Sequence, residues 1–488
     1  MNTTTVLITL IAYKTLLIVI GIWAQRRTHT SEDYFLGGRN LGPVVAAISY
    51  SASATSAWTL LGVSGIAYVA GLSTLWIAAG AIVGCAVAWL WVAPRMMRFS
   101  RTHNIITLTE FLAHDSDARN QKRITIFASA VIVLSFVVYI SSQFQGAGNT
   151  FSSTFDLGRS ESILIGATII MIYTLLGGFW AVSLTDTLQG MLMAVAAILL
   201  PVAAWVAVGG WEGFSSGLVA VSSPQQLSLS GGNIGLGILG FIAGNLAIGI
   251  GTFGQPHLLT RFMALRDERA LKQARWIAIG WYTLVFSGMC FLGLAGHILL
   301  PQSPTPETIF FDLTGLLFSP VVSGLLLAAV LSAIMSTADS LLLVCASSLS
   351  WDLGLGKRFA ERPLLVSRAA IVAICALSAW VALALPATIF ERVLFAWVAI
   401  GSAFGPLVFV RLAGIRVRSP GTLLSMVTGF VLAVALYLAP NTLGQAFERL
   451  IPFTCGLVLL LVFRIRAGAV STANTENPSA TGYSQQQP

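Results

Sequence analysis

The chain has 488 residues, of which 56% are hydrophobic and 9% are charged, and its mean hydropathy is +0.83. This balance excludes a soluble globular protein and indicates an all-α protein that crosses a membrane many times. The net charge of +8 raises the question of a nucleic-acid partner, but the basic residues lie in short loops between apolar stretches. Contact with the lipid bilayer explains such basic loops, so no nucleic-acid partner is expected.

Thirteen apolar segments are long enough to cross a bilayer as helices. They lie at 4–24, 43–70, 74–97, 124–148, 161–183, 185–209, 233–254, 274–299, 319–348, 367–386, 388–413, 419–439 and 446–465. The first lacks a preceding basic stretch and a small-residue cleavage site, so we expect a retained span rather than a signal peptide. The boundary near Ser183 is the least clearly marked, because no polar loop separates the fifth span from the sixth.

Nearly all of the 27 lysines and arginines lie in alternate loops. Because basic loops stay on the cytoplasmic side, this pattern predicts a cytoplasmic C terminus and an external N terminus in a plasma membrane. Residues 1–466 are expected to form a single transmembrane domain. Residues 467–488 are rich in Ser, Thr, Asn and Gln and are expected to form a disordered cytoplasmic tail. The Ser- and Gly-rich outer loop at 210–232 is expected to be a surface flap.

The second and seventh segments, 43–70 and 233–254, are unusually rich in small and polar residues. Interruptions at matching positions of two five-helix halves are typical of an inverted-repeat transporter with its binding site near the membrane midplane. The two repeats are expected at about 43–209 and 233–413. The spans contain no HExxH, no GxSxG and no paired acids suited to acid–base chemistry, so an enzyme is not expected.

The ninth segment carries a group of polar residues in otherwise aliphatic sequence, AAVLSAIMSTADSLLL from Ala328 to Leu343. At helical spacing, Ala333, Ser336, Thr337 and Ser340 fall on one face. Such an oxygen-rich surface suits a small cation. Hydroxyls in membrane helices also bond to neighbouring helices or to their own backbone, so this pattern alone favours an ion site only modestly.

Five motifs occur in the order found in one transporter family: SEDYFLGGRNLGP, SASATSAWTLLGVSG, YTLLGGFWAVSLTDTLQ, FGQPHLLTRFMA and SAIMSTADSLLL. Together they resemble the sodium:solute symporter family, and within it the bacterial sodium/proline symporter branch. The resemblance implies a leucine-transporter-like core of five plus five helices. It also implies Na⁺-coupled uptake of a small organic solute, such as proline or a similar polar molecule, by alternating access. Proton coupling and a sensor that has lost transport remain alternatives.

The resemblance further implies a role for particular residues. The carbonyls of Ala52, Thr55 and Ala333 and the hydroxyls of Ser336 and Thr337 would bind the co-transported Na⁺. Uncharged oxygens suit a monovalent ion that must leave again. The solute would contact six residues, namely Ser53, Trp58, Tyr139, Gln143, Thr252 and Pro256.

Three positions depart from the pattern of the proline branch. That branch has an acid where this chain has Ala54, and aromatic residues where this chain has Ile248 and Thr252. The missing carboxylate removes a partner for a solute ammonium group or a sodium ion, and the missing rings reshape the pocket. Proline itself is therefore in doubt as the solute, whereas a small zwitterion or another polar solute fits.

Three further ionisable residues have competing interpretations. Asp186 is implied to lie on the ion path, but it could instead be an acid at the start of the sixth span, with Thr185 as the helix cap. Asp339 lies beside the proposed ion face, where a structural role is favoured. His257 could relay protons, but we expect it to anchor a loop at the end of the seventh span.

Overall fold

The computed structural model describes residues 36–465 except 156, 177–178, 303–304, 356–362, 386 and 440–445, together with residues 8, 12, 15 and 19. Most of the predicted first span, 4–24, and the whole of the predicted tail, 467–488, lie outside the described residues. Within the described part the chain is helical, and its only β pairing is two isolated bridges, Leu41 with Leu265 and Val417 with Arg464.

The other twelve predicted spans all appear as helices in the described part of the chain. Their bounds are α3 Pro43–Ala57 continued by η2 Trp58–Val63 and α4 Ser64–Ala70; α5 Leu75–Val87 with η4 Ala88–Val92 and α6 Ala93–Thr102; α8 Ala118–Phe155; α9 Arg159–Leu176; α10 Phe179–Ala207; α12 Leu236–Leu246 with η5 Ala247–Gly254; α14 Glu268–Leu299; α16 Pro320–Ser347 with η7 Ser348–Asp352; α18 Pro363–Ala384; α19 Ile389–Leu412; α20 Ser419–Leu438; and α21 Ala446–Val462. By length and hydropathy, nine helical runs of the described residues can cross a membrane. One of them, 43–102, is long enough for two crossings and turns at Gly71, whose φ of 68° favours glycine.

Shorter helices connect the spans: α7 Leu108–Ala113, α11 Gly210–Val221, α13 Pro256–Ala264 and α15 Ile309–Leu317. The predicted flap at 210–232 is therefore partly helical, and α11 packs against α14. The predicted boundary near Ser183 is wrong, because α9 already ends at Leu176 and α10 begins at Phe179. Two glycines lie between them in the sequence, and glycine is a poor helix former, so hydropathy and loop polarity do not mark this boundary.

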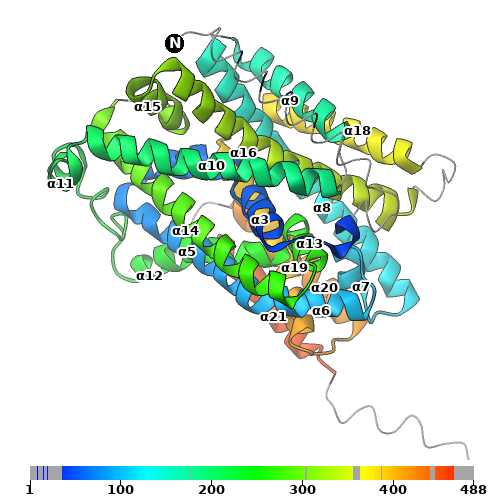
Figure 1. Ribbon diagram of the computed structural model, residues 1–488. Coiled ribbons are helices and arrows are strands. Elements are labelled where there is room, and N and C mark those ends of the chain that lie inside the picture. The colour runs from blue at the N-terminus through cyan, green and yellow to red at the C-terminus, as the bar shows by residue number, and fades with distance from the viewer. Residues whose placement is uncertain are drawn as a thin grey trace, which may run out of the picture.

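The broken helix α3 lies at the centre of the bundle, packed against α10, α14 and α16 (Figure 1). The second break follows η5, where Gln255 has extended φ/ψ of −74° and 111° and Pro256 starts α13. The first break thus falls within the second predicted span, whereas the second break directly follows the seventh, which ends at residue 254.

Glycines allow η5 to approach α5 at backbone distance. A Cβ atom added to Gly249 would lie 2.1 Å from the carbonyl oxygen of Gly80, and one added to Gly84 would lie 2.5 Å from the carbonyl oxygen of Gly249. No side chain larger than hydrogen fits at these positions, so the two segments meet backbone against backbone.

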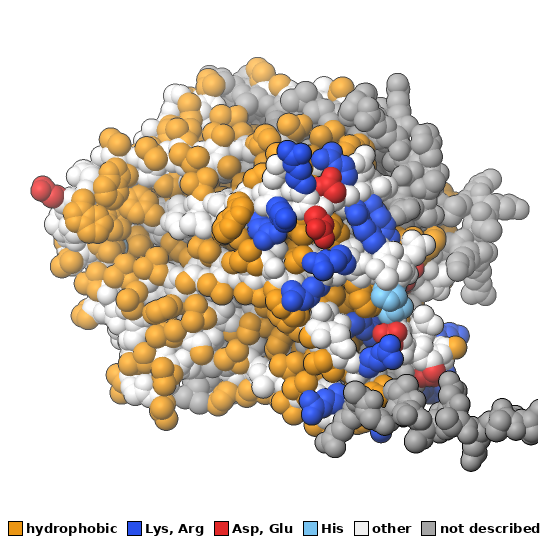
Figure 2. All heavy atoms as spheres, turned by 60° about the horizontal axis from the view of Figure 1, so that its bottom comes forward, with side chains coloured by type: hydrophobic (Ala, Val, Ile, Leu, Met, Phe, Trp, Pro, Cys, Tyr) orange, Lys and Arg blue, Asp and Glu red, His pale blue; other side chains and the backbone are white. Residues whose placement is uncertain are grey.

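The surface has the character of a membrane protein. Many large apolar side chains are exposed on the spans, for example Val206 at 71% and Trp276 at 66%. Figure 2 shows a largely hydrophobic face on which the Lys and Arg side chains gather in one area. A broad apolar surface with a segregated basic area is what a multi-pass protein presents to lipid and to one membrane interface.

Candidate functional site

Helix α3 breaks at Ser56, whose φ/ψ of 15° and −167° is non-helical. Side chains form hydrogen bonds with the backbone groups around the break. The Trp58 indole N–H donates to the carbonyl oxygen of Ala54 at 3.1 Å, and the backbone N–H of Ala57 donates to Oε1 of Gln143 at 3.3 Å. In the low dielectric of a membrane such groups need partners, so Trp58 and Gln143 stabilise the broken conformation.

Helix α16 reaches the carbonyl oxygens that precede this break. The Thr337 hydroxyl donates to the carbonyl oxygen of Ser53 at 3.0 Å and lies 3.5 Å from that of Ala52. Ala333 and Ser336 are fully buried on the same helix. The structure thus brings one predicted ion-site residue of α16, Thr337, to the predicted carbonyl of Ala52.

Two of the three remaining predicted oxygens, those of Thr55 and Ser336, have other neighbours as well. The carbonyl oxygen of Thr55 accepts a hydrogen bond from the backbone N–H of Trp58, and the Thr55 hydroxyl bonds back to Ser51. The Ser336 hydroxyl lies beside the Asp186 carboxyl group but forms no hydrogen bond with it. Because a carbonyl oxygen has two lone pairs, that of Thr55 can still serve a cation.

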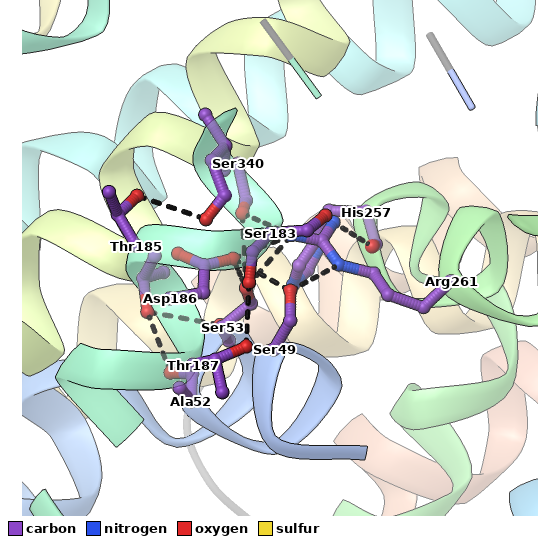
Figure 3. Close-up of polar contacts among 12 residues, drawn as sticks. Ser49, Ala52, Ser53, Ser183, Thr185, Asp186, Thr187, His257, Arg261 and Ser340 are labelled. Atoms are coloured by element: carbon purple, nitrogen blue, oxygen red, sulfur yellow. Dashed lines mark hydrogen bonds and ion pairs between the residues drawn. The ribbon is translucent and has the colours of Figure 1, made fainter. Parts of the chain in front are cut away.

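A buried ion pair lies next to this junction (Figure 3). One oxygen of Asp186, on α10, accepts hydrogen bonds from Arg261 of α13 at 3.0 Å, from Ser49 at 2.8 Å and from Ser53 at 3.2 Å. The Arg261 guanidinium also donates to the Ser340 hydroxyl at 2.6 Å. The exposed fractions of the Asp186 and Arg261 side chains are 0% and 1%, so each charge depends on the other and on the hydroxyls for solvation.

A small cavity adjoins the ion pair. Its volume is about 30 Å³, room for about one water molecule. Arg261, Ser340 and Pro256 line it, together with Thr107 and Asp352. Asp352 ends the η7 segment of α16, so the cavity follows that helix from the ion pair towards its C-terminal end.

An aromatic group surrounds the broken helix on another side. Trp58 packs against Phe286, Phe390 and Trp397, with ring centroids 5.5, 6.0 and 6.4 Å away. Gln143 donates to the Ser56 hydroxyl at 3.4 Å, and Tyr139 lies near that hydroxyl, one helical turn before Gln143. Of the residues predicted to contact solute, Trp58, Tyr139 and Gln143 therefore gather at the break.

The remaining three predicted solute residues lie elsewhere. Ser53 belongs to the network around Asp186. Pro256 lines the small cavity, and Thr252 lies in η5, where its carbonyl oxygen accepts a hydrogen bond from Gln255. The link between η5 and the aromatic group is Trp397, whose indole N–H donates to the carbonyl oxygen of Ile248 at 2.9 Å.

A carboxylate covers the start of α19, which carries two members of the aromatic group. Glu307, only 9% exposed, accepts hydrogen bonds from the backbone N–H groups of Ile389 at 3.2 Å and Phe390 at 3.1 Å. The first N–H groups of a helix have no partner within it, so Glu307 satisfies two of them. The position of Phe390 against Trp58 thus depends on a carboxylate that comes from the segment before α15.

Two interpretations of ionisable residues are wrong. Asp186 lies seven residues after the first residue of α10 rather than at its start, and the Thr185 hydroxyl bonds within the helix instead of capping it. His257 does not anchor a loop, because it is fully buried in α13 and its ring packs near Phe136 and Tyr139. For Asp339, the structure shows a hydrogen bond from Thr174 of α9 to its carboxylate.

Sequence reasoning missed Arg261 as a functional residue and counted it among the basic loops. A signal was available, because FGQPHLLTRFMA is almost wholly uncharged and a basic residue there needs a buried acid. Asp186 is such an acid, but 75 residues separate the two in sequence.

Comparison with known proteins gives a consistent result. A model of the sodium:solute symporter family matches residues 34–429. The high-affinity proline transporter PutP of Bacillus subtilis is 35% identical over 470 residues, which cover 94% of this chain and 98% of that protein. The sodium/proline symporter of Escherichia coli is 34% identical over 488 residues, which cover 96% and 95%.

Solved structures agree on the fold. A Na⁺-coupled sialic acid symporter in a substrate-bound, outward-open state superposes with a TM-score of 0.77 at 18% identity, covering 94% of this chain and 97% of that one. The nucleobase-cation-symport-1 transporter Mhp1 in a closed conformation superposes with a TM-score of 0.55 at 15% identity, covering 89% and 94%.

Proposed function

Because this chain belongs to the sodium:solute symporter family, and is thus a Na⁺-coupled solute transporter, we propose which of its residues carry the ion and the solute. One Na⁺ binds at the α3–α16 junction, to the carbonyl oxygens of Ala52, Thr55 and Ala333 and the hydroxyls of Ser336 and Thr337. The observation that carries this assignment is the contact of the Thr337 hydroxyl with the carbonyls of Ala52 and Ser53. A Na⁺ ion there would replace the hydroxyl as the partner of these carbonyls and would hold α3 in its broken form.

The solute binds at the break in α3, among Trp58, Tyr139 and Gln143. Aromatic walls with a few polar groups are typical of a small-molecule site. Relatives named for proline transport are 33–35% identical, which favours an amino acid or a similar small zwitterion as the solute. Ala54 supplies no carboxylate to hold an ammonium group, so a neutral polar solute that has no ammonium group also fits this site.

Coupling follows from the shared helix. Na⁺ and solute bind on either side of the same break, so an ion that orders the break also prepares the solute site. Each positive charge that moves down a membrane potential of 100 mV releases about 2.3 kcal/mol. The ion then leaves past Ser336 and Asp186 towards the small cavity beside Arg261.

The orientation and the domain division are part of the same proposal. The N terminus lies outside and the basic loops and C terminus lie in the cytoplasm of a bacterial cell, since the basic residues gather in one area (Figure 2). The repeats at about 43–209 and 233–413 form the transport core, because the first span of one is broken at Ser56 and the first span of the other ends at a break at Gln255.

Uptake into proteoliposomes tests this function. A panel of radiolabelled amino acids and other small polar solutes is presented with an inward Na⁺ gradient, and in parallel with choline in place of Na⁺ at the same pH. We expect at least one solute to accumulate with Na⁺ only. Accumulation driven equally well by a proton gradient in choline would favour proton coupling, and specific solute binding without any uptake would favour a sensor.

A further inference from the structure

The guanidinium of Arg261 has the surroundings of a bound cation. We propose that Arg261 is a built-in cation that holds the place of a second Na⁺ at Asp186, so that the protein binds a single Na⁺. The inference rests on the function proposed above and concerns how many ions the α3–α10–α16 junction accepts.

The ligands around the guanidinium are oxygens of the kind that bind alkali ions. One terminal nitrogen of Arg261 lies 2.6 Å from the Ser340 hydroxyl, 3.0 Å from the Asp186 carboxylate and 3.1 Å from the Ser53 hydroxyl (Figure 3). A second nitrogen, Nε, donates to the Ser49 hydroxyl at 3.3 Å. These four groups come from three different helices, and all four are buried.

The carboxylate needs a cation at this depth. A buried, charged Asp is strongly unfavourable unless a positive charge lies beside it. Arg261 is the only basic residue within ion-pair distance of Asp186 among the described residues. If a neutral side chain replaced Arg261, the carboxylate and its hydroxyl neighbours would remain as an all-oxygen set of net charge −1, which favours a monovalent cation.

The vacated set would also lie next to the proposed Na⁺ site. The second carboxylate oxygen of Asp186 makes no hydrogen bond, and the Ser336 hydroxyl lies beside that carboxyl group. Ser336, a proposed ligand of the first site, is thus also a neighbour of the second. The cavity of about 30 Å³ that Arg261 lines would give an ion at Asp186 a way out along α16.

The helix that carries Arg261 fixes the charge in place. The guanidinium donates to the backbone carbonyl of His257 within α13 and lies 5.2 Å from the centroid of the Phe179 ring. Unlike a free ion, this cation cannot leave with the solute. It can withdraw from Asp186 only by a change of its own rotamer or by a movement of α13 relative to α10.

Equilibrium binding of ²²Na⁺ to the purified full-length protein tests the proposal by counting ions per chain. We expect one Na⁺ for the wild type and two for Arg261→Gln. Arg261→Lys keeps the charge and is expected to bind one. The double variant Arg261→Gln/Asp186→Asn lacks the second site and is also expected to bind one.

Two results would overturn the proposal: a wild type that binds two Na⁺, or a folded Arg261→Gln variant that binds only one. Should Arg261→Gln fail to fold, Asp186→Asn decides the matter. This variant is expected to keep its single Na⁺, because Asp186 does not hold an ion in the wild type, and loss of that ion would contradict the proposal. Failure of the Na⁺ site at α3–α16 is detected separately, as an unchanged Na⁺ affinity in Thr337→Ala.

Discussion

The hydroxyl of Thr337 lies 3.0 Å from the carbonyl oxygen of Ser53, although 284 residues separate the two in the chain. This contact joins α16 to α3 directly before the break at Ser56. Both side chains are fully buried, so water cannot replace the hydrogen bond between the hydroxyl and the carbonyl. An ion bound here would feel any change in the position of either helix.

Thr337→Ala is expected to raise the Na⁺ concentration for half-maximal uptake at least several-fold, because it removes one oxygen from a small set of neutral ligands. Thr337→Ser keeps the hydroxyl and is expected to remain close to the wild type. Thr150→Ala is the control, since the Thr150 hydroxyl bonds only within its own helix, to Gly146. Na⁺ titrations of solute uptake measure the effect, and equal curves for Thr337→Ala and wild type would contradict the assignment.

Gln143→Leu is expected to destabilise the protein by about 1–3 kcal/mol, because it leaves the N–H of Ala57 without its partner at the break. We also expect a higher KM for the solute. Gln145→Leu is a matched control on the same helix, since Oε1 of Gln145 is buried without a hydrogen bond and its loss should cost little. Thermal unfolding in detergent and uptake kinetics measure both effects; similar behaviour of the two variants would argue against a special role for Gln143.

Gly251→Ala is expected to displace Trp397, because the added Cβ would lie 2.0 Å from Cδ1 of that ring. Overpacking of this kind costs about 1–3 kcal/mol, and here it also disturbs the ring that packs against Trp58. Gly280→Ala adds the same methyl group where nothing lies within 4 Å, and should leave stability and uptake nearly unchanged. Lower uptake in Gly280→Ala than in Gly251→Ala would show that the aromatic group is not sensitive to this contact.

Glu307→Ala is expected to lower the stability by about 2 kcal/mol, since two N–H groups at the start of α19 lose a charged acceptor. Glu391→Ala is the control: Glu391 also accepts from backbone, at Thr388, but at an exposed position. We expect a smaller loss for Glu391→Ala. Midpoints of thermal unfolding compare the two, and a larger loss at Glu391 would refute the role given to Glu307.

Burial raises the pKa of Glu307 above its ordinary value, against the lowering effect of the hydrogen bonds from Phe390 and Ile389. A carboxyl group with a raised pKa in the folded state favours folding while it is protonated. Its contribution is complete below the ordinary pKa and is lost as the pH rises through the folded-state pKa. As the pH rises above the ordinary pKa of a glutamate, the free energy of unfolding should therefore fall less for Glu307→Gln than for the wild type, and parallel pH curves would contradict this.

Hydropathy alone predicts the described spans well, because a helix in lipid must be long and apolar whatever it packs against. It fails between the end of α9 at Leu176 and the start of α10 at Phe179, because no polar residue in the sequence marks this boundary, and the predicted boundary near Ser183 lies within α10. The polar face of α16 was also predictable, since Ala333, Ser336 and Thr337 are spaced for one side of a helix. That this face meets Ala52 depends on packing between helices far apart in sequence, and only the family resemblance indicated it.

The pair of Asp186 and Arg261 shows the limit most clearly. Each residue has a local explanation as an interfacial charge, one near a predicted span start and the other in a predicted basic loop. Only the packing of α13 beside α10 shows that both are buried and that they neutralise each other. Charge counting by loops cannot detect a basic residue that folds back into the bundle.

The glycine contact between Gly80, Gly84 and Gly249 has a mechanical consequence. Interlocked side chains resist displacement, because each must leave its rotamer before its neighbour can pass. Where two backbones meet at glycines, no side chains interdigitate, so η5 can slide along α5 by small steps at low energetic cost. This glycine contact is suited to a sliding movement between η5 and α5, and a single methyl group at Gly249 would be enough to block that movement.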